Sequence, residues 1–301
     1  MGNHKFYGIV VTFEPTVEHF ENIKMMASEL SHLIIVDNSE GLKGFECLDS
    51  LNNISVLSNK NKNGIAGALN LGIVDLLEKN GGFVFLFDQD SSLPDGFVAN
   101  QSKFIIDNNE CCVAPRYYDV NSKTYGNYTI LSKFTIKNIM GEFLSKPTYT
   151  TFAITSGTLY SLDVFKKVGL MDESFFIDHV DSEFCIRMKH HNFKILINPE
   201  VVFNHSIGAR QLRTFLGVKF KPNNHNPTRR YYAVRNGIFM INLWGRDFPA
   251  LVWLLFLRNV YEFLGVLLFE SNRKEKLKAL FLGVYDGVVS KKGKCSRAFK
   301  Q

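Results

Sequence analysis

The chain has 301 residues, of which 46% are hydrophobic, so it can bury the core of one large domain or two small ones. This composition excludes an intrinsically disordered protein. The formal net charge is +6, but residues 271–301 alone carry nine Lys and Arg against two Asp and Glu. The basic excess therefore lies in the tail, which argues against a nucleic-acid-binding protein.

The first 120 residues alternate between strand and helix patterns. Helical spacing predicts a helix over 64–80, and Pro94 suits the first turn of another. Apolar runs predict strands at 7–13, 32–38, 54–59, 83–90 and 111–115. Strands separated by helices imply βαβ units in a parallel sheet that is covered on both faces. Ligands of such sheets bind at the carboxyl ends of the strands.

The pattern becomes irregular between Tyr117 and Pro147, and a new block follows. That block predicts a helix from Leu162, a helix from about Asp181 and a strand over 194–203. We divide the chain into a main domain, residues 1–240, and a C-terminal helical segment, residues 241–301, for membrane association or dimerisation.

The segment from Phe248 to Phe269 is apolar and long enough to span a bilayer. However, Arg258, Asn259 and Glu262 lie in its middle, and a charge at the bilayer centre costs roughly 2.5 to 3.5 kcal/mol. We therefore expect helices that lie in the membrane interface or pack on the domain.

The five cysteines are odd in number and have no CxxC spacing, which favours free thiols in a reducing cytoplasm. The N-terminal residues pass directly into a strand-like run, so we expect no secretory signal. Both features predict a cytoplasmic location.

The apolar run FVFLFDQD ends with two carboxylates, Asp88 and Asp90, that face the same side of a strand. They would repel each other unless a cation lay between them, and a divalent metal that bridges to substrate phosphates would serve. Solvated acids before a turn, or carboxylates paired with Lys or Arg, remain the alternative.

Two further features suit a nucleotide site. Asp37 ends the strand over 32–38 and could accept hydrogen bonds from a base or ribose, although an Asx turn would also explain it. Gly64 and Gly67 open the next helix, where small residues let a ligand approach and the helix N-terminus favours anions. Tight packing of that helix on the sheet is the alternative.

Six segments in this order resemble the successive motifs of family 2 glycosyltransferases: VVTFEP, IIVDNSE, NGIAGALNLGI, FLFDQDS, TSGTLYSLDVFKKVG and FFIDHVDSEFCIR. Within that family the chain is most similar to bacterial rhamnosyltransferases of cell-surface polysaccharide (O-antigen) synthesis, over about residues 6–240. The resemblance implies an enzyme with the GT-A fold, an α/β fold. Its nucleotide-binding half and acceptor-binding half share one mixed central sheet.

The resemblance also implies roles for particular residues. Asp88, Gln89 and Asp90 match the DxD element, with Asp90 favoured as the direct metal ligand, and His205 matches a histidine that completes the metal site in related enzymes. A polar residue at a strand end is the alternative for His205. The residues implied to line the nucleobase or donor-sugar pocket are Thr12, Phe13, Glu14, Asp37, Asn38, Asn63, Gly64 and Ala68.

Asp181 occupies the place of the catalytic base, where many members read Glu-Asp and this chain reads Val180-Asp181. Asp178 and Glu183 are the rival carboxylates. We expect the three histidines around this helix, at 179, 190 and 191, to lie on the surface.

The segment RRYYAVRN resembles an arginine-tyrosine segment of rhamnosyltransferases. Arg229, Arg230 and Arg235 are candidates to bind the diphosphate or an anionic acceptor, because Arg suits bidentate phosphate contacts. A solvated basic helix start is the alternative.

The implied reaction is an inverting, metal-dependent transfer. Mg²⁺ or Mn²⁺ would stabilise the leaving diphosphate, and Asp181 would take the proton of the acceptor hydroxyl. The implied donor is dTDP-L-rhamnose, with UDP-galactofuranose or another UDP-hexose as the alternative. A non-catalytic nucleotide-sugar-binding module is the alternative of a different class.

The implied acceptor is a saccharide on a polyprenyl diphosphate carrier. Aromatic and aliphatic residues beside Lys291, Lys292, Lys294 and Arg297 suit an anionic membrane surface. We therefore expect a peripheral protein on the cytoplasmic face of the bacterial inner membrane. A homodimer could instead cover the apolar side chains Trp253, Phe256, Leu264 and Leu267. No nucleic-acid partner is expected.

Overall fold

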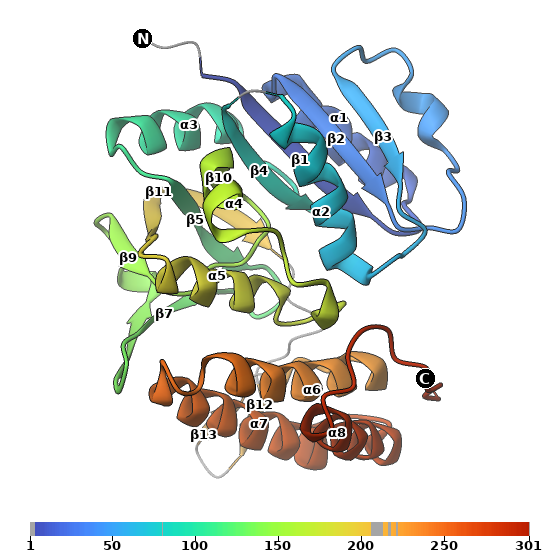
Figure 1. Cartoon of the computed structure of the whole chain (residues 1–301), viewed down its shortest axis with the longest axis vertical. Coiled ribbons are helices and arrows are strands. Elements are labelled where there is room, and N and C mark those ends of the chain that lie inside the picture. The colour runs from blue at the N-terminus through green and yellow to red at the C-terminus, as the bar shows by residue number, and fades with distance from the viewer. Residues whose placement is uncertain (1–3, 80, 206–212, 216–217, 221, 301) are drawn as a thin grey trace.

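The computed structural model describes residues 4–79, 81–205, 213–215, 218–220 and 222–300. An α/β domain occupies most of the chain, and three C-terminal helices form a separate layer against it (Figure 1). The α/β class and the C-terminal helices are as expected.

The elements follow one another along the chain as listed here. The strands are β1 Phe6–Thr12, β2 His32–Asp37, β3 Ile54–Ser58, β4 Phe83–Asp88, β5 Cys112–Asp119, β6 Thr124–Tyr125, β7 Asn127–Leu131, β8 Ile136–Met140, β9 Thr148–Thr150, β10 Thr158–Ser161, β11 Ile195–His205, β12 Arg213–Phe215 and β13 Val218–Phe220. The α-helices are α1 Val17–Glu29, α2 Gly64–Leu77, α3 Phe97–Asp107, α4 Leu162–Val168, α5 Val180–His190, α6 Pro227–Trp244, α7 Pro249–Phe269 and α8 Arg273–Val288. Short 3₁₀ turns are η1 Phe45–Leu48, η2 Gly141–Phe143 and η3 Glu173–Phe175.

Within the described residues, nine strands form one mixed sheet in the order β3-β2-β1-β4-β10-β5-β11-β9, with β6 paired to β5. The first four strands are parallel, as the sequence predicts. β10 then runs antiparallel to both β4 and β5, so the fifth predicted strand does not lie next to the fourth. The mixed sheet implied by the resemblance is confirmed.

Helices cover both faces of this sheet, which explains why its central strands are apolar on both sides. One cluster joins α2, α4 and α5 to one face, and the other joins α1 and α3 to the opposite face. Gly72 lets α2 approach closely, because a Cβ there would lie 2.9 Å from the side chain of Ile9.

Three predicted elements differ in detail. The helix expected from Pro94 begins at Phe97, after Gly96, which has a φ of +67°. Residues 117–147, which look irregular in sequence, contain the hairpin β7–β8, anchored by the buried Tyr128 and Leu131. Helix α2 ends at Leu77, and residue 80 of its predicted range lies outside the described residues.

The C-terminal layer is built on α6, which packs along α8 and also reaches the main domain. Tyr231 and Val234 pack against α8, whereas Phe239 and Met240 belong to the core of the α/β domain. The boundary that we predicted at residue 240 therefore lies inside a helix that both parts share.

Candidate active site

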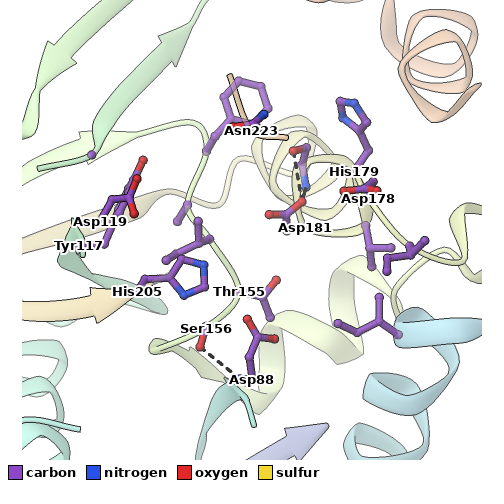
Figure 2. A pocket seen from close by; sticks show the side chains of 18 of the residues that line it. Asp88, Tyr117, Asp119, Thr155, Ser156, Asp178, His179, Asp181, His205 and Asn223 are labelled. Atoms are coloured by element: carbon purple, nitrogen blue, oxygen red, sulfur yellow. Dashed lines mark hydrogen bonds between the residues drawn. The ribbon is translucent and has the colours of Figure 1, made fainter. Parts of the chain in front are cut away.

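A cavity of about 900 Å³ lies where β4, β11 and α5 meet the C-terminal helices. Asp88 comes from the end of β4, Asp181 from the start of α5 and His205 from the end of β11 (Figure 2). Gln89, Asp90 and Arg229 line the same cavity. The structure thus brings six of the predicted site residues together.

Asp88 is half-buried at the carboxyl end of β4, and its backbone N–H donates to the Ser156 hydroxyl at 3.2 Å. Burial raises the pKa of Asp88 to about 6; the charge of His205 lowers it, while Asp90 and Asp181 add to the rise. Negative charge therefore concentrates at this end of the cavity, and a cation there would relieve it.

The side chains at this end of the cavity supply only some of the ligands that a divalent metal needs. Among the described residues, no three His, Cys, Asp or Glu side chains are grouped closely enough to hold an ion by themselves. Mg²⁺, however, is commonly bound by one or two carboxylates and completed by substrate phosphates and water. Asp88 and the exposed Asp90 fit a site of that kind, open to a diphosphate.

Gln89 connects the cavity to the segment after β1. Its side-chain oxygen accepts from the Phe13 N–H at 2.7 Å, and its amide donates to the Phe13 carbonyl at 3.2 Å. The next residue, Glu14, has a φ of +47° and donates its N–H to the Ser39 hydroxyl. Phe13 and Glu14 are both exposed beside the cavity rim.

The polar residues at the ends of β1 and β2 form a buried cluster outside the cavity lining. The Asp37 carboxylate accepts from the hydroxyls of Thr12, at 2.7 Å, and Ser39, at 2.9 Å. Asn38 donates to the Gly64 carbonyl and accepts from Asn59. In this conformation these side chains hold strand ends together and do not line the cavity.

The start of α2 is shaped by contact with the segment before α5. Gly64 has a φ of +66°, and a Cβ there would lie 2.2 Å from the carbonyl oxygen of Phe176. The exposed Asn63 donates to Glu173, and Ala68 is fully buried on α2. Close packing against Phe176, and not against the sheet as the alternative interpretation had it, therefore explains Gly64. Neither Gly64 nor Ala68 lines the cavity.

The turn that precedes α5 has an unusual backbone. Phe176, Asp178 and His179 have φ values of 65°, 62° and 61°, which side chains with a Cβ rarely adopt. Each such residue costs of order 1 to 3 kcal/mol and persists only where surrounding contacts impose it.

Helix α6 supplies those contacts. The fully buried Asn236 donates its amide to the carbonyls of Phe175, Ile177 and Asp178 at 2.7–2.9 Å. Arg229 donates to the Asp178 carboxylate at 2.8 Å. The direction in which α5 starts thus depends on residues about 55 positions further along the chain.

Asp181 lies in the first turn of α5 and accepts hydrogen bonds from the Ser182 N–H at 2.7 Å and hydroxyl at 3.3 Å. Burial raises the pKa of Asp181, and this outweighs the Ser182 bonds and the charge of Arg258, which lower it. A carboxylate with a raised pKa is a better proton acceptor at neutral pH.

The two rival carboxylates are both committed to arginines. Burial raises the pKa of Asp178, but the charge and hydrogen bonds of Arg229 outweigh this, so its pKa lies below the usual value. Glu183 is buried, forms an ion pair with Arg187 on α5 at 2.7 Å and does not line the cavity. Asp181 therefore suits the role of proton acceptor best.

Two of the three arginines predicted to bind anions have structural roles instead. Arg230 is buried in ion pairs with Glu262 and Glu270. Arg235 is fully buried, and its guanidinium donates to the carbonyls of Gly293 and Phe175. The predictions for Arg230 and Arg235 were wrong because both side chains face the interior of the helical layer.

The sequence also misplaced one histidine. His179 lines the cavity and is 6% exposed, although we expected it on the surface. Burial and the charge of Arg258 lower its pKa to about 3, so it is neutral. His190 and His191 are exposed, as expected.

Helix α7 contributes Arg258, Tyr261 and Glu262 to the cavity wall, which sequence reasoning did not foresee. Their signal in the sequence is the set of polar residues, Arg258, Asn259 and Glu262, that interrupts an otherwise apolar helix.

Comparison with known proteins identifies the family of this chain. Residues 14–169 match the sequence model of glycosyl transferase family 2. The chain is 28% identical over 295 residues to the dTDP-rhamnosyl transferase RfbF of Shigella flexneri, and the match covers 95% of this chain and 96% of that protein.

Solved structures of S. aureus TarS share the fold. The crystal structure of residues 1–349 of TarS has a TM-score of 0.51 at 13% sequence identity, covering 95% of this chain and 72% of that one. The same fragment in complex with UDP-GlcNAc gives a TM-score of 0.52 at 14% identity, covering 95% and 73%. With a family match over more than half of its length and this fold, the chain belongs to glycosyl transferase family 2.

Proposed function

We propose that this glycosyltransferase moves L-rhamnose from dTDP-L-rhamnose to a hydroxyl of a saccharide acceptor. Support comes from the likeness to a dTDP-rhamnosyl transferase over nearly the whole of both chains. A UDP-hexose such as UDP-galactofuranose is the second candidate donor, since a TarS structure of the same fold is described in complex with UDP-GlcNAc.

The observation that carries the mechanism is the placement of Asp88 and Asp181 on different walls of one cavity (Figure 2). Asp88 and Asp90, with His205 nearby, would hold Mg²⁺ or Mn²⁺, which when bound neutralises charge on the diphosphate. Gln89 fixes the backbone beside these carboxylates through its bonds to Phe13.

Asp181 accepts the proton of the attacking hydroxyl in this proposal. Its raised pKa and its place in the cavity suit that role. Asp178 also lines the cavity but is paired with Arg229, so one carboxylate acts as base and none as nucleophile in this proposal, which implies inversion at the anomeric carbon. Arg229, which already holds Asp178, adds positive charge between the two ends of the cavity.

The proposed acceptor is a saccharide carried on a polyprenyl diphosphate at the cytoplasmic face of the inner membrane. The cavity volume of about 900 Å³ lies near the upper end of the roughly 300 to 1,000 Å³ of small-molecule pockets, which suits a large ligand such as a nucleotide sugar. The resemblance to transferases of surface polysaccharide synthesis supports the carrier.

A donor panel tests this proposal. We expect dTDP-L-rhamnose with Mg²⁺ or Mn²⁺ to give the largest rise in Tm and to yield a rhamnosylated synthetic lipid acceptor, detected by mass spectrometry. EDTA should abolish transfer. dTDP-D-glucose is the matched control, since it has the same nucleotide and a different sugar.

Three other outcomes of these experiments would each change the proposal. Transfer from a UDP-hexose alone would establish the second candidate donor. Binding of a donor without transfer to any saccharide acceptor would identify a non-catalytic nucleotide-sugar-binding module. Full activity in EDTA would reject the role given to Asp88 and Asp90.

A further inference from the structure

Helix α7 has two faces of different character. Its inward face packs Leu251, Leu255 and Val266 against the protein and presents Arg258 and Tyr261 to the cavity. Its outward face is apolar and exposed, and its members recur every three or four residues, as one side of a helix requires: Val252, Trp253, Phe256, Leu257, Val260, Phe263, Leu264 and Leu267.

Helix α8, which packs against α7, also has an exposed apolar side. Phe281 is 66% exposed and Tyr285 62%, and Val284 and Val288 lie on the same side of the helix. The opposite side of α8 is buried against α6. Scattered exposed apolar residues are ordinary, but a row of them on each of two helices that pack together indicates an interaction site. We call these outward sides of α7 and α8 the apolar face.

Basic residues follow the apolar face directly. Lys291, Lys292 and Lys294 are exposed, two to six residues after the exposed Val288 and Val289. Of the other basic residues of the tail, Lys276 is buried beside Glu270 and Arg297 is paired with Asp286, whereas Lys274, Lys278 and Lys300 are exposed. Lys291, Lys292 and Lys294 are the exposed lysines that directly follow the apolar side of α8.

Length and composition alone would allow α7, Pro249–Phe269, to cross a membrane. Its contacts favour a helix that lies along the surface. Glu262 is buried in an ion pair with Arg230, and Leu251 and Leu255 belong to the core of the domain. Inserting α7 across a bilayer would break these contacts and leave Arg230 without one of its counter-charges.

We propose that the apolar face, with Lys291, Lys292 and Lys294 at its edge, docks on an anionic phospholipid bilayer, with α7 lying in the interface. Aromatic and aliphatic residues beside lysines suit such a surface. Lysine is depleted in protein–protein interfaces, so this combination favours lipid over a second copy of the chain.

Docking in this orientation has a consequence for the cavity. A helix is about 10 to 12 Å across, and α7 alone separates the apolar face from the wall formed by Arg258 and Tyr261. A lipid-linked acceptor would then reach the cavity past α7. This last step rests on the proposed function, whereas the docking itself does not.

Vesicle flotation of the full chain tests the docking. We expect flotation with vesicles of 30% phosphatidylglycerol in phosphatidylcholine, much less with pure phosphatidylcholine, and release by high salt. Charge reversal of Lys291, Lys292 and Lys294 to Glu should weaken binding by at least roughly 100-fold, since each lysine near an anionic surface contributes about fivefold and each new carboxylate is repelled. The same reversal at the exposed Lys43, Lys103 and Lys137 is the control.

The apolar contribution is tested separately. Trp253→Ser with Phe281→Ser should abolish flotation, whereas Phe143→Ser, at a side chain 70% exposed on the other side of the domain boundary, should not. Donor-induced stabilisation, and transfer to a short water-soluble acceptor, should be unchanged in all these variants.

Each outcome decides one claim. Unchanged flotation of both sets of variants would overturn the docking, as would a loss of dimer in light scattering without any loss of flotation. Flotation without glycosyl transfer from any donor would reject the proposed function and leave the docking intact.

Discussion

The two ends of the cavity position their carboxylates in different ways. Asp88 ends β4, which is paired along its length with β1 and β10, so the sheet itself places the side chain. Asp181 follows a turn of left-handed residues that Asn236 of α6 holds in place. The position of a site residue on a central strand is thus set by its local sequence pattern and by strand pairing. The position of a residue after a strained turn depends on contacts with a distant helix.

The largest loss of activity should follow substitution of Asp181, the proposed proton acceptor. Asp181→Asn should lower kcat by about 10²- to 10⁴-fold, because it removes the proton acceptor, and leave donor-induced stabilisation intact. Asp163→Asn, an exposed carboxylate paired with Lys166, is the control. A wild-type rate for Asp181→Asn, measured by product formation, would reject the assignment.

Substitution of Asp88, at the end of β4, should have a different effect. Asp88→Asn should lower kcat by about 10²-fold, as loss of one group that stabilises developing charge does, and should also weaken metal-dependent donor binding. Calorimetry of donor binding with and without Mg²⁺ separates the two ends. If Asp88→Asn and Asp181→Asn changed metal-dependent donor binding equally, the separate roles proposed for the two carboxylates would be wrong.

Substitution of one side chain, the Asn236 amide, tests whether the turn before α5 depends on α6. Asn236→Ala removes the three hydrogen bonds that its amide donates and the one that its oxygen accepts from Arg235, and it should lower the free energy of unfolding by about 2 to 4 kcal/mol. It should also lower kcat by about 10- to 100-fold through misplacement of Asp181, with little change in donor KM.

Asn53→Ala is the matched control for that variant. Its amide donates to the carbonyls of Ala27 and Leu30 at the other end of the molecule. It should lose stability without losing kcat, measured below the unfolding transition. A wild-type kcat for Asn236→Ala would show that the turn keeps its shape without α6.

The smallest effect concerns pH. His179 has a folded pKa of about 3 against 6.5 for an unperturbed histidine, so the unfolded chain takes up a proton first as pH falls. Its contribution to stability is therefore present above pH 6.5 and is lost as pH falls towards 3.

His179→Asn should reduce this loss, since Asn does not titrate there and tolerates a positive φ. Urea unfolding at pH 7.5 and pH 5 measures the change. His190→Asn, at an exposed histidine, should keep the wild-type pH dependence. Equal slopes for both variants would contradict the burial of His179.

Much of the nucleotide-binding half could be predicted because its signals are local. The strands expected at 7–13, 32–38, 54–59 and 83–90 correspond to β1, β2, β3 and β4, whose apolar runs end in polar residues. β10 was harder to place, since it has only four residues and inserts beside β4 through a long excursion of the chain.

The site residues, too, could be predicted from local sequence only in part. Asp88, Asp90 and Asp181 were foreseen, and they line one cavity. Arg229 and Arg235 look alike in sequence, yet one lines that cavity and the other is fully buried. Arg235 is buried by contacts with Phe175 and Gly293, which lie far from it in the sequence, and no pattern within the segment reveals them.

The chain folds back on itself near its end. The Gly293 N–H donates to the Ser174 carbonyl at 3.0 Å, Arg235 donates to the Gly293 carbonyl, and the Cys295 N–H donates to the Tyr232 hydroxyl. A recombinant version that stops before residue 293 would therefore disturb the segment that leads into α5. An affinity tag is better placed ahead of β1, whose first residues lie at the opposite end of the molecule from this closure (Figure 1).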